Sequence, residues 1–146
     1  MIAIASDHGA LRLKKEITEY LDKQGVGYKD FGTYRAESCD YADFAIPLAE
    51  AVAKGEYQFG ILLCGTGIGM SIAANKVKGI RAAVACDEFS AKAARAHNDA
   101  NILCMGERVI GSGLALSIIQ TFLGAAFEGG RHKTRIDKIA KYERGR

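Results

Sequence analysis

Short apolar runs alternate along the chain with longer stretches in which apolar residues recur at helical spacing. The short runs are rich in Ile, Val, Leu and Ala. They do not show the alternation of apolar and polar residues that a half-exposed strand would have. This pattern is typical of strands that are buried on both faces of a parallel sheet. We expect these strands at residues 2–6, 26–31, 59–64, 81–86 and 101–105.

The stretches between the strands predict helices. Leu13, Ile17 and Leu21 recur four residues apart, and Gly25 ends that helix. Pro47 lies near the start of the next helix, where proline is best tolerated. We predict these further helices at residues 44–54, 70–76, 88–96 and 114–127.

Regular alternation of strand and helix predicts one α/β domain over residues 1–146. A chain of this length buries about 70% of its unfolded surface, which is enough for one core but leaves no room for a second substrate domain. We therefore expect a three-layer α/β/α, Rossmann-like domain in which right-handed crossovers join five parallel strands.

The composition is that of an ordinary globular protein, with 49% hydrophobic residues, 25% charged residues and a net charge of +3. No apolar run approaches the roughly 20 residues of a membrane span, and the first residues lack the basic start of a signal peptide. We therefore expect a cytoplasmic protein with no membrane partner. The four cysteines contain no C-x-x-C pair, which argues against a structural zinc site and predicts four free thiols.

The last segment of the chain is strongly basic. Residues 131–146 hold seven Lys and Arg against Asp137 and Glu143, so this segment carries +5 and the rest of the chain −2. A nucleic-acid-binding arm would have such a charge. Because apolar Ile136 and Ile139 interrupt the charges, we interpret the segment as a basic helix that docks on the domain or on a dimer partner, and we expect no nucleic-acid partner.

Reactive and glycine-rich segments follow four of the five predicted strands. In open parallel sheets ligands bind at the carboxyl ends of the strands, so these segments are expected to meet at one edge. Each residue alone is as often a turn residue or a helix cap, but their joint presence indicates a reactive site. The segments are Ser6-Asp7-His8-Gly9, CGTGIG at 64–69, Cys86-Asp87 and Gly106-Glu107-Arg108.

The loop CGTGIG is the central feature of that edge. Its alternating glycines allow backbone N–H groups to converge on an anion, and the following helix adds its positive end. The same field favours the thiolate form of a cysteine at this turn. The loop therefore offers a base or nucleophile beside an oxyanion hole.

Three other glycine-loop chemistries fit the residues less well. A phosphatase-type C-x5-R loop needs Arg at position 70, and a dinucleotide loop needs Gly there, but the residue is Met70. A Walker loop needs Gly-Lys followed by Ser or Thr, which is absent.

Two of the three histidines lie in polar turns, His8 after the first strand and His97 in the segment HNDAN. The plain interpretation of HNDAN is a helix end capped by asparagines. Arg131 and Arg135 stand four residues apart, so a helix would point both guanidinium groups one way, as a phosphate requires. The residues alone favour the plainer interpretation, a solvated basic face.

Seven motifs in order resemble one known family over the whole chain. They are SDHGA at 6–10, DFGT at 30–33, DYADF at 40–44, ILLCGTGIGMSIAANKVKGIRAAV at 61–84, AHNDANIL at 96–103, GERVIG at 106–111 and FEGGRHKTRI at 127–136. The family is that of the type B ribose-5-phosphate isomerases, in the group that also contains the galactose-6-phosphate isomerase subunits. The resemblance implies a strand order of 2-1-3-5-4.

The resemblance also implies an aldose–ketose isomerase that interconverts D-ribose 5-phosphate and D-ribulose 5-phosphate through a cis-enediolate, without a metal or organic cofactor. Cys64 matches the general base, Thr66 and the loop glycines match the enediolate hole, and His97 matches the group that opens the furanose ring. The positions that match substrate contacts are Asp7, His8, Tyr41, Gly65, Gly67, Ile68, Gly69 and Asn98. Those that match the phosphate side are His8, Arg108, Arg131 and Arg135.

The chain departs from the family pattern at two places. The family usually has Pro where Ala42 stands, and some members carry the base on an acidic residue further along the glycine loop. Here that stretch is Met70-Ser71, which leaves Cys64 as the only candidate. The galactose branch commonly lacks the histidine at 97 and the arginine pair, so the ribose branch is favoured. Isomerisation of allose 6-phosphate or galactose 6-phosphate, and non-catalytic sugar-phosphate binding, remain the alternatives.

The position of His97 bears on assembly. It lies between a helix and the following strand, hence at the edge opposite Cys64. The family is dimeric, with sites built from both subunits. We therefore predict a homodimer in which His97 acts across the interface, and whether dimers pair into tetramers stays open.

Overall fold

Five parallel strands form one sheet in the computed structural model, which describes residues 1–145. The strands are β1 (Ile2–Ser6), β2 (Tyr28–Asp30), β3 (Phe59–Cys64), β4 (Ala82–Val84) and β5 (Ile102–Gly106). Their order is β2-β1-β3-β5-β4, which confirms the predicted sheet and its strand order.

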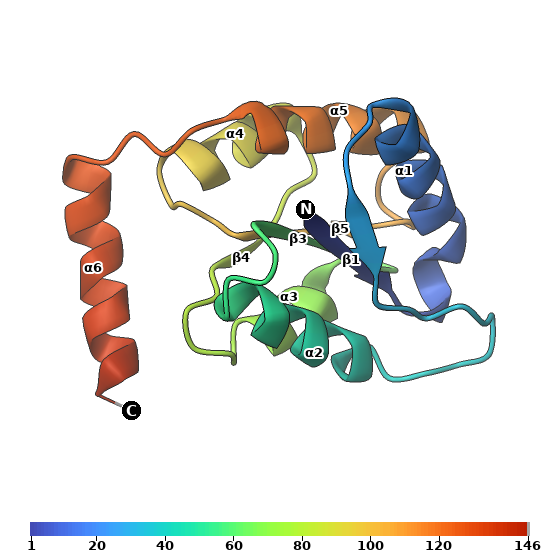
Figure 1. Cartoon of the computed structure of the whole chain (residues 1–146), viewed down its shortest axis with the longest axis horizontal. Coiled ribbons are helices and arrows are strands. Elements are labelled where there is room, and N and C mark those ends of the chain that lie inside the picture. Colours follow the sequence, from blue (N-terminus) through green and yellow to red (C-terminus); the bar gives the residue numbers. More distant parts are fainter. Residues whose placement is uncertain (146) are drawn as a thin grey trace.

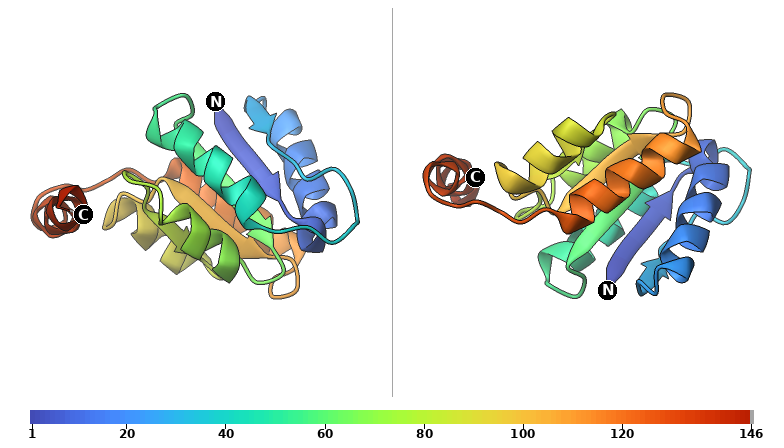
Figure 2. Two further views of the ribbon diagram at one scale, coloured as in Figure 1. Left: turned by 90° about the horizontal axis from the view of Figure 1, so that it is seen from below. Right: turned by 90° about the horizontal axis from the view of Figure 1, so that it is seen from above.

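Helices cover both faces of this sheet, as the three-layer prediction requires (Figures 1 and 2). They are α1 (Leu11–Lys23), which follows a short 3-10 turn, α2 (Ala42–Ala53), α3 (Ile68–Ala74), α4 (Glu88–Ala96), α5 (Ser112–Gly124) and α6 (Arg131–Arg144). Helices α1, α4 and α5 pack on one face, and α2 and α3 pack on the other. No helix within residues 1–145 is both long and apolar enough to cross a membrane.

Successive strand residues point to opposite faces, and both faces are apolar, which explains the unbroken apolar runs in the sequence. One core contains Ile4, Ile61, Leu63, Leu103 and Met105, and the other contains Ala3, Ala5, Leu62, Cys64, Ile102 and Cys104. Cys64 is therefore a member of the core between the sheet and α2 and α3.

Several predicted boundaries were wrong by two or three residues. Helix α2 begins at Ala42 rather than at residue 44, which places Pro47 in its second turn rather than its first. Helix α5 spans Ser112–Gly124 rather than 114–127, because the backbone becomes extended at Ala125. The two edge strands are shorter than predicted, since β2 pairs only with β1 and β4 only with β5.

Helix α6 stands away from the rest of the domain (Figures 1 and 2). His132 is its only buried residue among those described. Near its other end, the Gly79 N–H donates to Oε2 of Glu143 at 3.0 Å. Ile139 and Tyr142 are 59% and 76% exposed. Even with α6 beside the domain, as predicted, this apolar stripe of the helix is therefore exposed to solvent in a single chain.

The turn between α4 and β5 is held by a buried arginine. Nη1 of Arg95 donates to Oδ1 of Asp99 and to the carbonyl of Ala100, both at 2.8 Å. Its guanidinium also lies 4.6 Å from the ring centre of Phe59 and 5.9 Å from that of Phe122. Asp99 itself has a φ of +46°, so the turn depends on these bonds to keep its shape.

We predict that Arg95→Met lowers the free energy of unfolding by about 2–4 kcal/mol, because it leaves Oδ1 of Asp99 and the buried Ala100 carbonyl without the Arg95 donor, while Arg81 still contacts Oδ2 of Asp99. Arg12 offers a matched control, since its ion pair with Glu16 is exposed and its replacement by Met should change stability little. Chemical denaturation measures both variants. Equal small losses would show that the arginine does not hold the turn.

Candidate active site

Backbone hydrogen bonds bring the carboxyl ends of β1, β3 and β5 into contact. The Asp7 N–H donates to the carbonyl of Leu63 at 3.1 Å, which places the end of β1 beside β3. The N–H groups of Glu107 and Arg108 donate to the carbonyls of Cys64 and Gly65, both at 3.0 Å. The predicted meeting at one edge of the sheet is therefore confirmed for the segments that follow β1, β3 and β5.

The thiol of Cys64 lies at the centre of this edge. The residue ends β3 and is 5% exposed. Its Sγ accepts a hydrogen bond from the Gly67 N–H at 3.0 Å, and the Ile68 N–H donates to Oγ1 of Thr66 at 3.2 Å. The loop thus points a backbone donor at the sulfur, and such a hydrogen bond stabilises the thiolate form of a cysteine.

Glycine is required at Gly67 for two reasons. Its φ is +81°, and a Cβ there would lie 3.0 Å from the backbone of Met105 on β5. A Cβ at Gly69 would meet the ring of Tyr41 at 2.8 Å, so this predicted substrate contact lies directly against the loop. The ring is 42% exposed and forms part of the open side of the site.

Asp7 and His8 are held by local bonds. Oδ1 of Asp7 accepts from the Gly9 N–H at 2.8 Å, so the carboxylate caps the turn after β1. Nδ1 of His8 accepts from the Cys39 N–H at 3.2 Å, and the Cys39 Sγ lies 3.6 Å away. This bond places the proton of the neutral ring on Nε2.

Glu107 supports the same edge in a way that the sequence motif did not reveal. Its Oε1 accepts from the Leu13 N–H at 2.7 Å and thereby caps the start of α1. Because α1 follows the turn that carries Asp7 and His8, this bond ties that turn to the end of β5. Glu107 belongs to the motif GERVIG, but nothing in that motif indicates a hydrogen bond to Leu13, which lies 94 residues away in the sequence.

The other titratable groups near this edge have structural roles. Burial, together with the nearby Cys64, raises the pKa of the Cys104 thiol far above its usual range, so Cys104 is not a candidate base. The carboxylate of Asp87 accepts from the N–H of Ser90, and this bond lowers the pKa of Asp87. Asp87 is thus the N-cap of α4. Of the two interpretations of this residue, helix cap or member of a reactive site, the structure shows the helix cap. All four cysteines are free, as predicted.

His97 lies at the opposite edge of the sheet. It ends α4, and β5 then runs from Ile102 beside Gly60 to Gly106 beside Cys64. A strand of this length spans roughly 15 Å, so His97 and Cys64 of one chain are separated by the length of the strand. Asn98 accompanies His97, and its carbonyl accepts from Nε of Arg81 at 2.9 Å.

Two residues that the sequence analysis did not select accompany His97. The ring of His132 stacks on that of His97, with centres 4.3 Å apart and planes within 10°. Oε1 of Glu128 lies 3.5 Å from Nε2 of His132 and 3.9 Å from Nε2 of His97. The exposed Arg131 and Arg135 lie on the first turns of α6 beside this cluster. The motif FEGGRHKTRI contained both missed residues, but only its two arginines suggested a ligand.

The fold and the carboxyl edge together define a Rossmann-like α/β enzyme with a buried thiol in a glycine loop. The Ribose/Galactose Isomerase family profile matches residues 2–139. The chain therefore belongs to the ribose/galactose isomerase family, as the sequence motifs indicated.

Relatives extend over nearly the whole chain. Ribose-5-phosphate isomerase B of Escherichia coli is 48% identical over 145 residues, covering 99% of this chain and 97% of that protein. The structure of Clostridium thermocellum ribose-5-phosphate isomerase B has a TM-score of 0.97 at 56% identity, covering 99% and 97% of the two chains. That of the Mycoplasma genitalium enzyme with bound ribulose 5-phosphate has a TM-score of 0.94 at 46% identity, covering 98% and 95%.

We predict that Gly67→Ala lowers the free energy of unfolding by about 2–4 kcal/mol, because the left-handed backbone and the contact with Met105 both penalise a methyl group. Gly113→Ala is the matched control, since a Cβ there meets nothing within 4 Å and should raise helix stability by up to about 1 kcal/mol. Denaturant titration compares the two. A loss no larger at Gly67 than at Gly113 would contradict the described loop geometry.

Proposed function

We propose that this protein interconverts D-ribose 5-phosphate and D-ribulose 5-phosphate by proton transfer through a cis-enediolate. The thiolate of Cys64 removes the proton from carbon 2 of the open-chain aldose and returns it to carbon 1. The C2–H bond breaks and a C1–H bond forms, while a proton moves from the oxygen on carbon 2 to the oxygen on carbon 1, so no carbon–carbon bond breaks and no redox partner is consumed. Ring opening precedes this step and is the proposed task of His97.

The placement of Cys64 carries the proposal. Its sulfur lies at the carboxyl edge of the sheet and accepts from the Gly67 N–H at 3.0 Å. A sugar carbon bound above the loop would face the sulfur, while its developing oxyanion would face the backbone donors of residues 65–69. The bound product in the Mycoplasma genitalium relative supports the choice of substrate for a chain 46% identical to it.

The surrounding residues fit the remaining substrate groups. Tyr41 lies against Gly69, and Oδ1 of Asp7 and the backbone of Gly65 both lie beside Gly9, so both side chains are placed to contact sugar hydroxyls in this proposal. His8 presents Nε2 beyond its bond to the Cys39 N–H, and Arg108 packs along Gly65. A histidine N–H and a guanidinium beside one loop suit a phosphate group.

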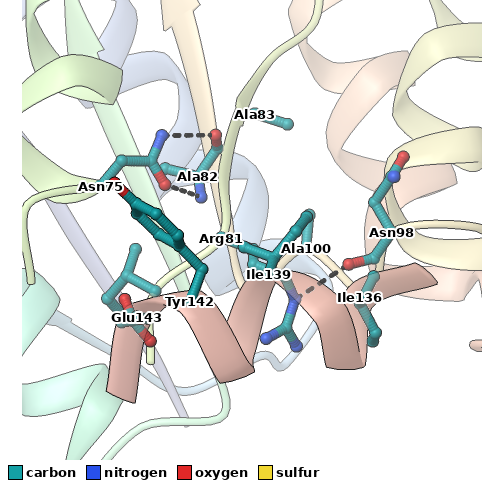
Figure 3. Close-up of a pocket in the computed structure, with 11 residues that line it drawn as sticks. Asn75, Arg81, Ala82, Ala83, Asn98, Ala100, Ile136, Ile139, Tyr142 and Glu143 are labelled. Atoms are coloured by element: carbon teal, nitrogen blue, oxygen red, sulfur yellow. Dashed lines mark hydrogen bonds between the residues drawn. The ribbon is translucent and has the colours of Figure 1, made fainter. Parts of the chain in front are cut away.

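A second copy of this chain supplies the missing half of the site in our proposal. His97, Asn98, Arg131 and Arg135 belong to the edge that is remote from Cys64 of the same chain. Helix α6 leaves a groove of about 420 Å³ beside β4, and Figure 3 shows Ile136, Ile139 and Tyr142 of α6 along one side of it. Burial of this apolar stripe would favour a homodimer with composite sites.

The proposed reaction uses a small sugar phosphate and requires no cofactor, nucleic acid or membrane. Four free cysteines, one of them the proposed base, are typical of a reducing compartment, so we propose the cytoplasm as its place of action.

Replacing the proposed base gives the first functional test. We expect native protein in EDTA to form ribulose 5-phosphate from ribose 5-phosphate, and Cys64→Ala to lower kcat/KM at least about a hundredfold, as loss of a general base does. Cys86→Ala is the matched control, because that thiol is exposed and outside the loop, and it should retain activity. Full activity in Cys64→Ala would refute the assignment of the base.

The native result also separates the alternatives. Turnover of six-carbon sugar phosphates with none of ribose 5-phosphate would place the substrate in the other branch of the family. Failure with both would favour a binding module without catalysis.

Mixing two inactive variants tests the composite site. In a heterodimer of Cys64→Ala and His97→Asn chains, one site combines both defects and the other is intact. Random exchange of subunits should therefore restore about a quarter of native activity. Sites built within single chains would stay inactive after mixing. The homodimer itself is checked by light scattering.

A further inference from the structure

The cluster of His97, Glu128 and His132 has the donor set of a metal site. One ligand atom from each residue lies within 4.8 Å of the other two. Two imidazole nitrogens and one carboxylate oxygen are the His2Glu set that binds Zn²⁺ and leaves a fourth position open. This set was not visible in the sequence, where the cysteine spacing argued against structural zinc.

The distances are near those of a tetrahedral site. Oε1 of Glu128 is 3.5 Å from Nε2 of His132 and 3.9 Å from Nε2 of His97. Two ligands at about 2.1 Å from a tetrahedral zinc ion are separated by roughly 3.4 Å. The two Glu128 pairs are within about half an ångström of this separation, whereas the ligand atoms of the group are separated by up to 4.8 Å, so the two imidazole rings have to approach each other by up to about 1.4 Å.

The anchoring of the three residues allows such a shift. The side chain of His132 is 9% exposed and therefore enclosed by its neighbours, whereas the side chains of His97 and Glu128 are 44% and 57% exposed. The Glu128 N–H donates to the Ala96 carbonyl at 3.0 Å, which keeps its backbone beside the end of α4. A metal must lie in the plane of each imidazole ring, so the stacked His97 ring has to turn about its Cβ–Cγ bond on binding.

We propose that His97, Glu128 and His132 form a Zn²⁺ site whose occupation inhibits the enzyme. In this site Nε2 of His97 coordinates the metal, so this nitrogen cannot take part in ring opening while zinc is bound. The site also joins the first turn of α6 to the end of α4. The inhibitory consequence rests on the proposed function of His97, whereas metal binding does not.

Binding is tested first, on EDTA-treated protein carrying Cys64→Ser so that the loop thiol cannot hold the metal. Competition with a chromogenic chelator should show one Zn²⁺ per chain at the cluster. Glu128→Gln and His132→Gln should each weaken this binding at least about tenfold. Asp137→Asn is the matched control, because it also removes an exposed carboxylate, in the middle of α6, and it should bind as before.

A thermal readout keeps the result independent of folding defects. Zinc should raise the Tm of the parent protein and of Asp137→Asn by stabilising the folded state, and should not raise that of Glu128→Gln. Zinc binding that is equal in Glu128→Gln, His132→Gln and the parent protein, or no binding, would overturn the proposed site.

Inhibition is tested on the otherwise native chain. Zn²⁺ should suppress ribose 5-phosphate turnover reversibly, EDTA should restore it, and Glu128→Gln should need at least about tenfold more zinc. Equal sensitivity of Glu128→Gln would place the inhibitory metal elsewhere and refute this part. Cluster-dependent zinc binding by a chain that turns over no sugar phosphate would support the metal site and contradict the proposed function instead.

Discussion

All five strands run in one direction, so their carboxyl ends meet at one edge, and the site depends on this constraint. The hydrogen bonds from Asp7 to Leu63 and from Glu107 to Cys64 join three strand ends that are distant in the sequence. The same geometry separates His97 from Cys64, because one precedes β5 and the other ends its neighbour β3. The cooperation that we propose between these residues would therefore require a second chain.

The central thiol belongs to the core and to the site at once. Cys64 is 5% exposed and packs among the apolar residues under α2 and α3, yet its sulfur faces the Gly67 N–H. The loop can approach so closely because Gly67 lies against the backbone of Met105 with no side chain between them. Packing thus fixes the position of the proposed base, which leaves little freedom for the sulfur to move away from a bound sugar.

The features that could be predicted from the sequence are those that local residue patterns and the common direction of the strands determine. Buried strands such as β3 and the reactive segments at their ends were evident, since apolar runs and the loop CGTGIG are contiguous in the chain. Edge-strand lengths and the start of α2 were not, because they depend on tertiary pairing and on how Pro47 is accommodated. The contacts of Glu107 with Leu13 and of Glu128 with His132 were missed, since side-chain partners follow from the fold.

A crystal structure of this protein with ribulose 5-phosphate would test the composite thiolate site most directly. The account predicts a dimer in which Sγ of Cys64 lies about 3–3.5 Å from carbon 1 or 2 of the sugar, the contact distance of a reacting pair. It also predicts that His97 reaches the same sugar from the other subunit. A sugar bound away from Cys64, or contacted by Cys64 and His97 of a single chain, would contradict the account.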